Sequence, residues 1–176
     1  MKFNYYAFRA MYLHEMDRFK RTLMQSLFSP VLSTSLYFIV FGSVIGGYVE
    51  KIDGISYGSF IVPGLLMLTL LTQSISNTSF GIFFPKFNGT MYEILAAPIS
   101  TFEIVLAFVG AGATKTLIVG VVIFLTATFF VEVQVMYPLL MIFLLVLVAF
   151  TFALFGFLIG LMSSNFEQMS IVPTLV

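Results

Sequence analysis

The sequence predicts an all-α, polytopic helical membrane protein with an N-terminal interfacial amphipathic helix, four complete spans and the start of a fifth. Two observations carry this prediction. Hydrophobic residues make up 60% of the 176 positions and charged residues only 9%, whereas a soluble domain carries about 25% charged residues. Four long apolar runs, separated by polar stretches, each reach the roughly 20 residues that a membrane-spanning helix needs.

The composition also excludes several functions. Cysteine is absent and His14 is the single histidine, so the chain offers no disulfide, thiolate metal site or histidine cluster. The few lysines and arginines form no aromatic-interleaved basic surface, which argues against nucleic-acid binding. The sequence has no paired carboxylates, no Ser/His/Asp set and no Gly-x-x-x-x-Gly-Lys-Ser/Thr loop, so we expect neither catalysis nor ATP hydrolysis here. The acidic residues occupy separate loop positions, where we expect mostly solvated charges.

Residues 1–24 hold most of the charge and show helical periodicity. Apolar and aromatic side chains recur at three- and four-residue spacing on one face: Tyr5, Phe8, Tyr12, Met16, Phe19 and Leu23. The basic residues assigned to this helix are Arg9, Arg18, Lys20 and Arg21. The pattern is typical of an amphipathic helix in the headgroup region of a membrane. A solvated juxtamembrane tail is the alternative.

The four spans are predicted at 27–48, 60–84, 104–131 and 139–162, with 171–176 as the start of a fifth. Pro30 is expected in the first turn of the first span, where a missing backbone amide is tolerated. Gly156 and Gly160 lie four residues apart in the fourth span. Such small residues let a neighbouring helix approach closely.

Two features inside the spans are candidates for a transport pathway. The stretch from Gln73 to Ser79 is unusually polar, and Gln73, Ser74 and Asn77 either bond neighbouring helices or line a water-accessible path. Lys115 interrupts the third run, where a charge costs on the order of 3 kcal/mol on insertion scales. Its side chain should face protein or water, or reach the cytosolic interface by snorkelling; snorkelling is the favoured prediction.

A polar loop, residues 86–100, separates the second and third spans. Thr90 is an N-cap type with Glu93 three positions on, the spacing of a capping box, and a two-turn helix is expected there. Gly89 lets the chain turn before this helix and Pro98 ends it. A short helix held between two spans is suited to passing force to a cytosolic partner. An ordinary tight loop is the alternative.

The distribution of basic residues predicts the orientation. The N-terminal segment and the central loop hold most of them: Lys2, Arg9, Arg18, Lys20, Arg21 and Lys86. The two opposite connections hold only Lys51. By the positive-inside rule the N-terminus, the loop at 86–100 and residues 163–170 are cytosolic. The predicted location is the cytoplasmic (inner) membrane.

Two segments carry a resemblance to a known family, Gly89-Thr-Met-Tyr-Glu-Ile-Leu-Ala-Ala-Pro98 and Asn165-Phe-Glu-Gln168. With the order of helices and loops over the whole chain, they resemble the permease subunit of type-two ABC transporters, the drug and polysaccharide exporter class. The family's first cytoplasmic loop similarly reads Gly-Thr, Glu, Leu and then Pro. Family members usually continue through a fifth and a sixth span, so the chain looks like a truncated copy or fragment.

The resemblance implies a membrane subunit of an ATP-driven exporter rather than an enzyme. Its partners would be an ABC ATP-binding subunit, which carries the ATP and Mg, a second permease chain in a homodimer, and membrane lipid. ATP-driven closure of the ATPases would tilt the spans and open a route outward for a drug-like, lipid or glycan substrate. The coupling helix would present these residues to the ATPase: Lys86, Gly89, Thr90, Glu93, Leu95 and Pro98.

Two alternative functions remain open. A channel or proton-coupled carrier of another class needs a carboxylate or histidine inside a span to bind the coupling ion. None of the four predicted spans contains one. A membrane assembly subunit without transport activity would fit a chain with weak pathway chemistry.

Overall fold

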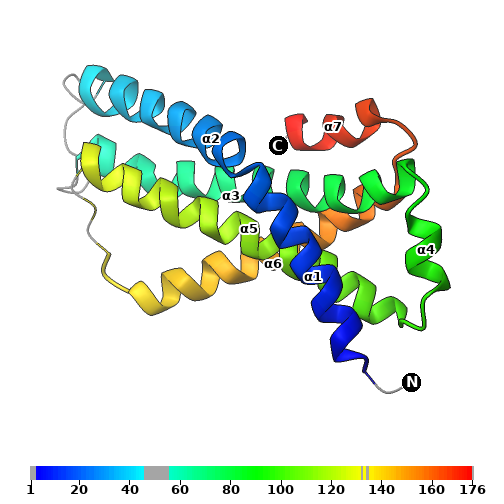
Figure 1. The fold of residues 1–176 in the computed structure, drawn as a ribbon. Coiled ribbons are helices and arrows are strands. Elements are labelled where there is room, and N and C mark those ends of the chain that lie inside the picture. The colour runs from blue at the N-terminus through cyan, green and yellow to red at the C-terminus, as the bar shows by residue number, and fades with distance from the viewer. Residues whose placement is uncertain (1–2, 46–55, 132, 134, 176) are drawn as a thin grey trace.

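The computed structural model describes residues 3–45, 56–131, 133 and 135–175. Along the chain the helices are α1 (Tyr5–Arg21), α2 (Leu23–Tyr37), the π-helix η1 (Phe38–Ile45), α3 (Tyr57–Phe87), α4 (Met91–Ala96), α5 (Thr101–Phe130), α6 (Pro138–Met162) and α7 (Phe166–Leu175). Figure 1 shows α2, α3, α5 and α6 running lengthwise through the molecule, with α4 across one end. No strand occurs among these residues, so the predicted all-α class is confirmed.

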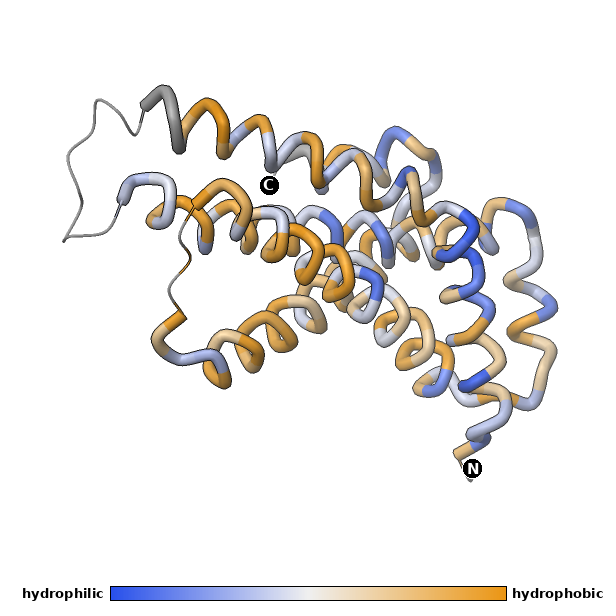
Figure 2. The backbone as a smooth tube through the Cα atoms, turned by 60° about the vertical axis from the view of Figure 1, so that its left-hand side comes forward, coloured by the Kyte–Doolittle hydropathy of each residue, from blue (hydrophilic) through white to orange (hydrophobic). Residues whose placement is uncertain are grey.

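Four helices within the described part of the chain are long and apolar enough to cross a membrane. They are Leu23–Phe41, Tyr57–Phe87, Thr101–Phe130 and Pro138–Met162. The last three cover the runs predicted at 60–84, 104–131 and 139–162 and begin one to three residues earlier. The predicted end at Val131 lies one residue beyond α5, which ends at Phe130. Figure 2 shows hydrophobic positions along these helices, whereas hydrophilic positions gather on α1 and α4 toward one end. The polytopic membrane fold is therefore confirmed.

The first span begins earlier than its prediction. The chain is helical from Leu23 through Ile45, while the rest of the span predicted at 27–48 and the polar connection around Lys51 lie outside the described residues. Pro30 lies well inside α2, so its placement in the first turn is wrong. The reason is that α1 ends at Arg21 and α2 begins directly after Thr22, earlier than the apolar run indicates.

Helix α3 lies at the centre, in contact with α5, α6 and α7. Its contact with α6 depends on two glycines. A Cβ atom added at Gly156 would lie 2.5 Å from the carbonyl oxygen of Ile75, and one at Gly160 would lie 2.5 Å from that of Ser79. The small-residue pair therefore brings two helix backbones together, as expected for membrane helices.

Helix α5 packs against both α3 and α6 and is the most buried of the spans. It also uses small residues at close approaches, because a Cβ at Gly112 would lie 2.0 Å from the Thr78 hydroxyl oxygen. The main core cluster joins Ile82 of α3 to the first half of α5 and to Ala149, Ala153 and Phe157 of α6. Residues 171–175 of the segment predicted at 171–176 lie in α7, which begins already at Phe166, and Val176 lies outside the described residues.

Candidate functional site

Helix α4 is the exposed segment between two buried spans. It has six residues, and none of them is buried. Gly89 turns the chain before it in the left-handed region, with φ at +79°, a conformation that glycine adopts without strain. Tyr92 is 78% exposed and Leu95 63% exposed, so an apolar surface faces outward at this end of the molecule.

The capping box predicted at Thr90 and Glu93 does not form. Thr90 has helical angles, φ −61° and ψ −19°, and makes no side-chain capping bond. An N-cap residue needs extended backbone angles to aim its hydroxyl at the helix amides, and Thr90 does not have them. Thr90, Glu93, Leu95 and Pro98 are all exposed, while Gly89 is half-buried.

The capping box forms at the start of α5 instead. Ser100 has extended angles, and its hydroxyl accepts a hydrogen bond from the Glu103 amide at 3.3 Å. The Glu103 carboxylate accepts from the Ser100 amide at 2.9 Å and, through its other oxygen, from the Asn4 amide just before α1. Glu103 is only 2% exposed, so the expectation of a solvated acidic loop residue is wrong for it. Its burial is compensated by these amide donors.

Lys86 holds the end of α3 to the end of α6. Its ammonium donates hydrogen bonds to the carbonyl oxygens of Leu161, at 2.6 Å, and Ser163, at 2.9 Å. Carbonyls at a helix C-terminus lack intrahelical partners, and a lysine there satisfies them. On its inner side, α4 packs Met91 and Ile94 against the core cluster. The loop is therefore fixed at both ends and along one face.

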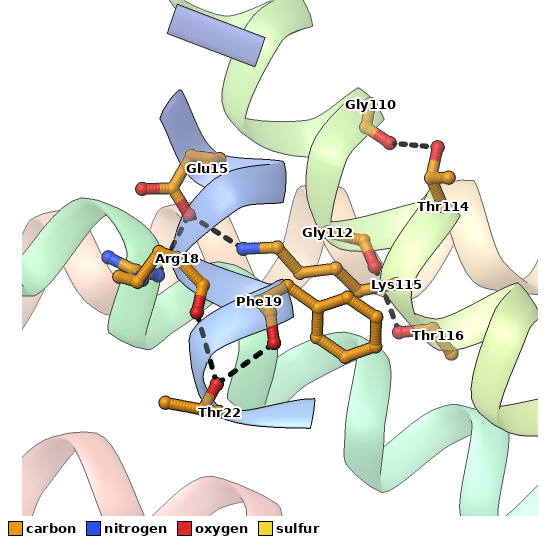
Figure 3. A network of polar contacts seen from close by, with 9 residues as sticks. All are labelled: Glu15, Arg18, Phe19, Thr22, Gly110, Gly112, Thr114, Lys115 and Thr116. Carbon is orange, nitrogen blue, oxygen red and sulfur yellow. Dashed lines mark hydrogen bonds and ion pairs between the residues drawn. The ribbon is translucent and has the colours of Figure 1, made fainter. Parts of the chain in front are cut away.

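Helix α1 is joined to α5 by polar side chains as well as by apolar packing. The Tyr12 hydroxyl donates to Thr114 at 2.9 Å. Figure 3 shows the second contact, between the Lys115 ammonium and the Glu15 carboxylate at 2.7 Å. Both members of the ion pair are nearly inaccessible, with side chains 4% exposed. Snorkelling of Lys115 to the interface is therefore wrong: the ammonium faces protein, because Glu15 supplies its counter-charge inside the fold.

The four basic residues assigned to α1 have different environments. Arg18 contacts the same Glu15 oxygen at 2.8 Å, and its guanidinium lies 5.4 Å from the centre of the Phe80 ring. Arg9, Lys20 and Arg21 are exposed, as expected for the polar side of an amphipathic helix. Lys20 pairs with the neighbouring Asp17 at 2.9 Å, an exposed contact of little energetic weight.

The polar residues of α3 point in different directions. Ser74 is fully buried and donates to the Ala149 carbonyl of α6 at 2.6 Å, the contact expected of a residue that bonds helices together. Gln73 lines a cavity of about 200 Å³ between α2 and α3. Asn77 donates to Gln73 at 3.4 Å and lines a larger cavity of about 490 Å³, which Lys115 also borders.

The sequence held signals for the buried charges that the prediction missed. Glu15 falls three residues after Tyr12 and four before Phe19, on the apolar face of the helix, where a lone carboxylate needs a partner. Lys115 is the matching cation in an apolar run. Ser100 and Glu103 also have capping-box spacing, whereas the prediction placed a capping box only at Thr90 and Glu93.

Comparison with known proteins places these features in a family. The family model for ABC-2 type transporters matches residues 6–176. The chain is 38% identical over 170 residues to the inner membrane transport permease YadH of Escherichia coli K12, and equally to those of Escherichia coli O157:H7 and Shigella flexneri. These matches cover 97% of this chain and 66% of each relative, so the chain spans just under two thirds of their length. No solved structure matches it. With its four membrane-spanning helices, this chain belongs to the ABC-2 type transporter family.

Proposed function

We propose that this chain is the membrane-spanning permease subunit of an ATP-driven exporter in the inner membrane, with its N-terminus and α4 in the cytosol. Membership of the ABC-2 family and similarity to proteins named inner membrane transport permeases support this function. Hydrolysis of ATP then takes place on a separate ATP-binding subunit, and a second permease chain completes the pathway.

The observation that carries the proposal is the fixed, exposed helix α4. Its outward side chains are free for a partner, while its ends are tied to spans through the Gly89 turn and the Ser100–Glu103 capping box. A surface that passes force must be both accessible and stiffly attached, because a flexible tether would absorb the displacement. Thr90, Glu93 and Leu95 are the proposed contacts with the ATPase. Lys86 precedes them at the end of α3, which it fixes to the end of α6.

A displacement of α4 is transmitted directly to α1 and α5. Glu103 lies at the start of α5 and also binds the Asn4 amide, so displacement of the loop displaces α1 with α5. Further along, the Glu15–Lys115 pair keeps the two helices together. Closure of two ATPases would thus tilt a unit of α1 and α5 against α3, a shift between two packed arrangements.

The proposed pathway runs along the face of α3 that carries Gln73 and Asn77. These residues and Lys115 line cavities in the single chain, and they offer amide and ammonium contacts beside many apolar side chains. Ser74 faces α6 and would act on the pathway only by holding that contact. A drug-like, lipid or glycan substrate fits such mixed chemistry.

A photo-crosslinking amino acid at Tyr92 tests the function. In native membranes it should form a covalent adduct with a polypeptide that carries a Gly-x-x-x-x-Gly-Lys-Ser/Thr phosphate-binding loop, identified by mass spectrometry. The same amino acid at Met136, 83% exposed between α5 and α6, is the matched control and should give no such adduct. Absence of an ATPase adduct at Tyr92, or its appearance at Met136, would overturn the proposal.

A further inference from the structure

The cavity of about 490 Å³ has an unbalanced charge. It lies between the α1–α2 junction, α3, α5 and α7, and its charged lining residues are Arg18 and Lys115. Both cations contact one oxygen of the same carboxylate, that of Glu15, at 2.8 and 2.7 Å. Glu15 itself does not line the cavity. The cluster of two cations and one carboxylate therefore carries one excess positive charge beside this partly open cavity.

Such an excess is costly here because the Lys115 side chain is only 4% exposed and that of Arg18 26%. Buried charges are normally paired, because the low dielectric of the interior provides little of the solvation that water does. The Glu15 carboxylate is the hydrogen-bond acceptor that the described residues give to the Lys115 ammonium, and it is shared with Arg18. An anion in the cavity would complete the charge balance.

Neutral donors line the same space. The side chains of Gln25, Ser26 and Ser76 line the cavity and make no hydrogen bond to another described residue. The Thr22 and Ser79 hydroxyls, by contrast, are already bonded to backbone carbonyls. These free hydroxyl and amide groups can therefore donate hydrogen bonds to a ligand that also contacts the two cations. The polar residues Asn77 and Ser170 and the apolar residues Phe19, Phe80, Met169 and Pro173 also line the cavity.

We propose that this cavity binds a phosphate group. A tetrahedral phosphate presents several acceptor oxygens at once, which suits the Arg18 fork, the Lys115 ammonium and the free serine hydroxyls together. A carboxylate would leave more of these donors unused. The phosphate can belong to an anionic lipid, whose chains would lie against the neighbouring apolar surface, or to a small phosphorylated molecule. This site is independent of the contact with an ATPase.

The test measures the thermal unfolding midpoint of the purified chain in two arms. In the first, nanodiscs of phosphatidylcholine are compared with nanodiscs that also contain phosphatidylglycerol. In the second, phosphatidylcholine nanodiscs receive inorganic phosphate or sodium chloride at equal ionic strength. A bound anion stabilises the folded chain and raises its midpoint. A rise with phosphatidylglycerol identifies a lipid phosphodiester, and a rise with inorganic phosphate identifies a free phosphate or monoester.

Two variants of α1 provide the matched comparison. Arg18→Gln removes the excess charge yet leaves the Glu15–Lys115 pair, so the midpoint rise should be lost. Arg21→Gln removes the same charge from an exposed position outside the cavity and should keep the rise. Ser76→Leu fills the cavity without changing any charge, should abolish the rise, and decides the question alone if Arg18→Gln does not fold. No rise in either arm, or equal loss in Arg18→Gln and Arg21→Gln, would overturn the site.

Discussion

Glu15 is the residue on which the polar contact between α1 and α5 depends. Its carboxylate is the shared partner of Lys115 and Arg18, and it is 3% exposed. An uncompensated charge in such a position is much more costly than the loss of the pair as a whole. The energetic role of Glu15 is therefore to neutralise Lys115 where water cannot.

Variants that lack Glu15, Lys115 or both distinguish the cost of an uncompensated charge from the cost of losing the whole pair. Glu15→Gln should lower the free energy of unfolding by about 3–5 kcal/mol, because Lys115 stays buried without its counter-charge. The double variant Glu15→Gln with Lys115→Met should recover most of that loss. Lys115→Met alone should cost less than Glu15→Gln, since Glu15 keeps Arg18. Unfolding midpoints in one detergent measure all three; a double variant as unstable as Glu15→Gln would contradict the ion pair.

At the scale of elements, the attachment of α4 depends on the capping box that follows it. Ser100→Ala removes the hydroxyl that binds the Glu103 amide and should cost about 1 kcal/mol, the usual value of an N-cap. Thr90→Ala is the control, because the Thr90 side chain makes no capping bond, and should be neutral. Thermal unfolding of both variants measures the difference. A larger loss for Thr90→Ala would restore the capping box predicted from sequence.

The contact between α3 and α6 depends on Gly156 having no side chain. Gly156→Ala would place a methyl group 2.5 Å from the Ile75 carbonyl oxygen, so the two helices must separate. Overpacking of this kind costs about 1–3 kcal/mol. Gly64→Ala in α3 has nothing within 4 Å of the new Cβ and should be neutral or slightly stabilising. The fraction of monodisperse protein after mild heating measures both; an intact Gly156→Ala variant would show that the helices can shift.

For the whole molecule, the polar end that contains α1 and α4 decides the orientation in the membrane. Leu95 of α4 and Met136 between α5 and α6 are both exposed, at opposite ends of α5. Because the chain has no cysteine, Leu95→Cys and Met136→Cys can each be labelled alone.

An impermeant maleimide should label Met136→Cys in right-side-out membrane vesicles and Leu95→Cys only in inverted ones. The unmodified chain, free of cysteine, gives the background. We expect this outcome because the N-terminal and central segments carry the excess of basic residues, and segments with such an excess stay in the cytosol. Labelling of Leu95→Cys in right-side-out vesicles would reverse the orientation and remove α4 from any cytosolic ATPase.

The membrane fold itself could be predicted from the sequence because its determinants are local. A run such as 139–162 is apolar over enough residues to cross a bilayer wherever it stands, and α6 occupies Pro138–Met162. The exposed loop around Glu93 and the turn at Gly89 likewise follow from neighbouring residues. The start of the first span was predicted less accurately, since Thr22 divides α1 from α2 within one continuous helical pattern.

The tertiary structure decided the partners of the charged residues. Glu15 and Lys115 are 100 positions apart, and Lys86 is 75 positions from Leu161, so no local pattern could pair them. The fold also decided that the capping-box spacing at Ser100 forms its bonds and the one at Thr90 does not, because the backbone angles at both residues depend on how the loop joins α3 to α5. Hydrophobicity is a property of a segment and could be read from it, whereas charge compensation is a property of the space between segments and exists only once they pack.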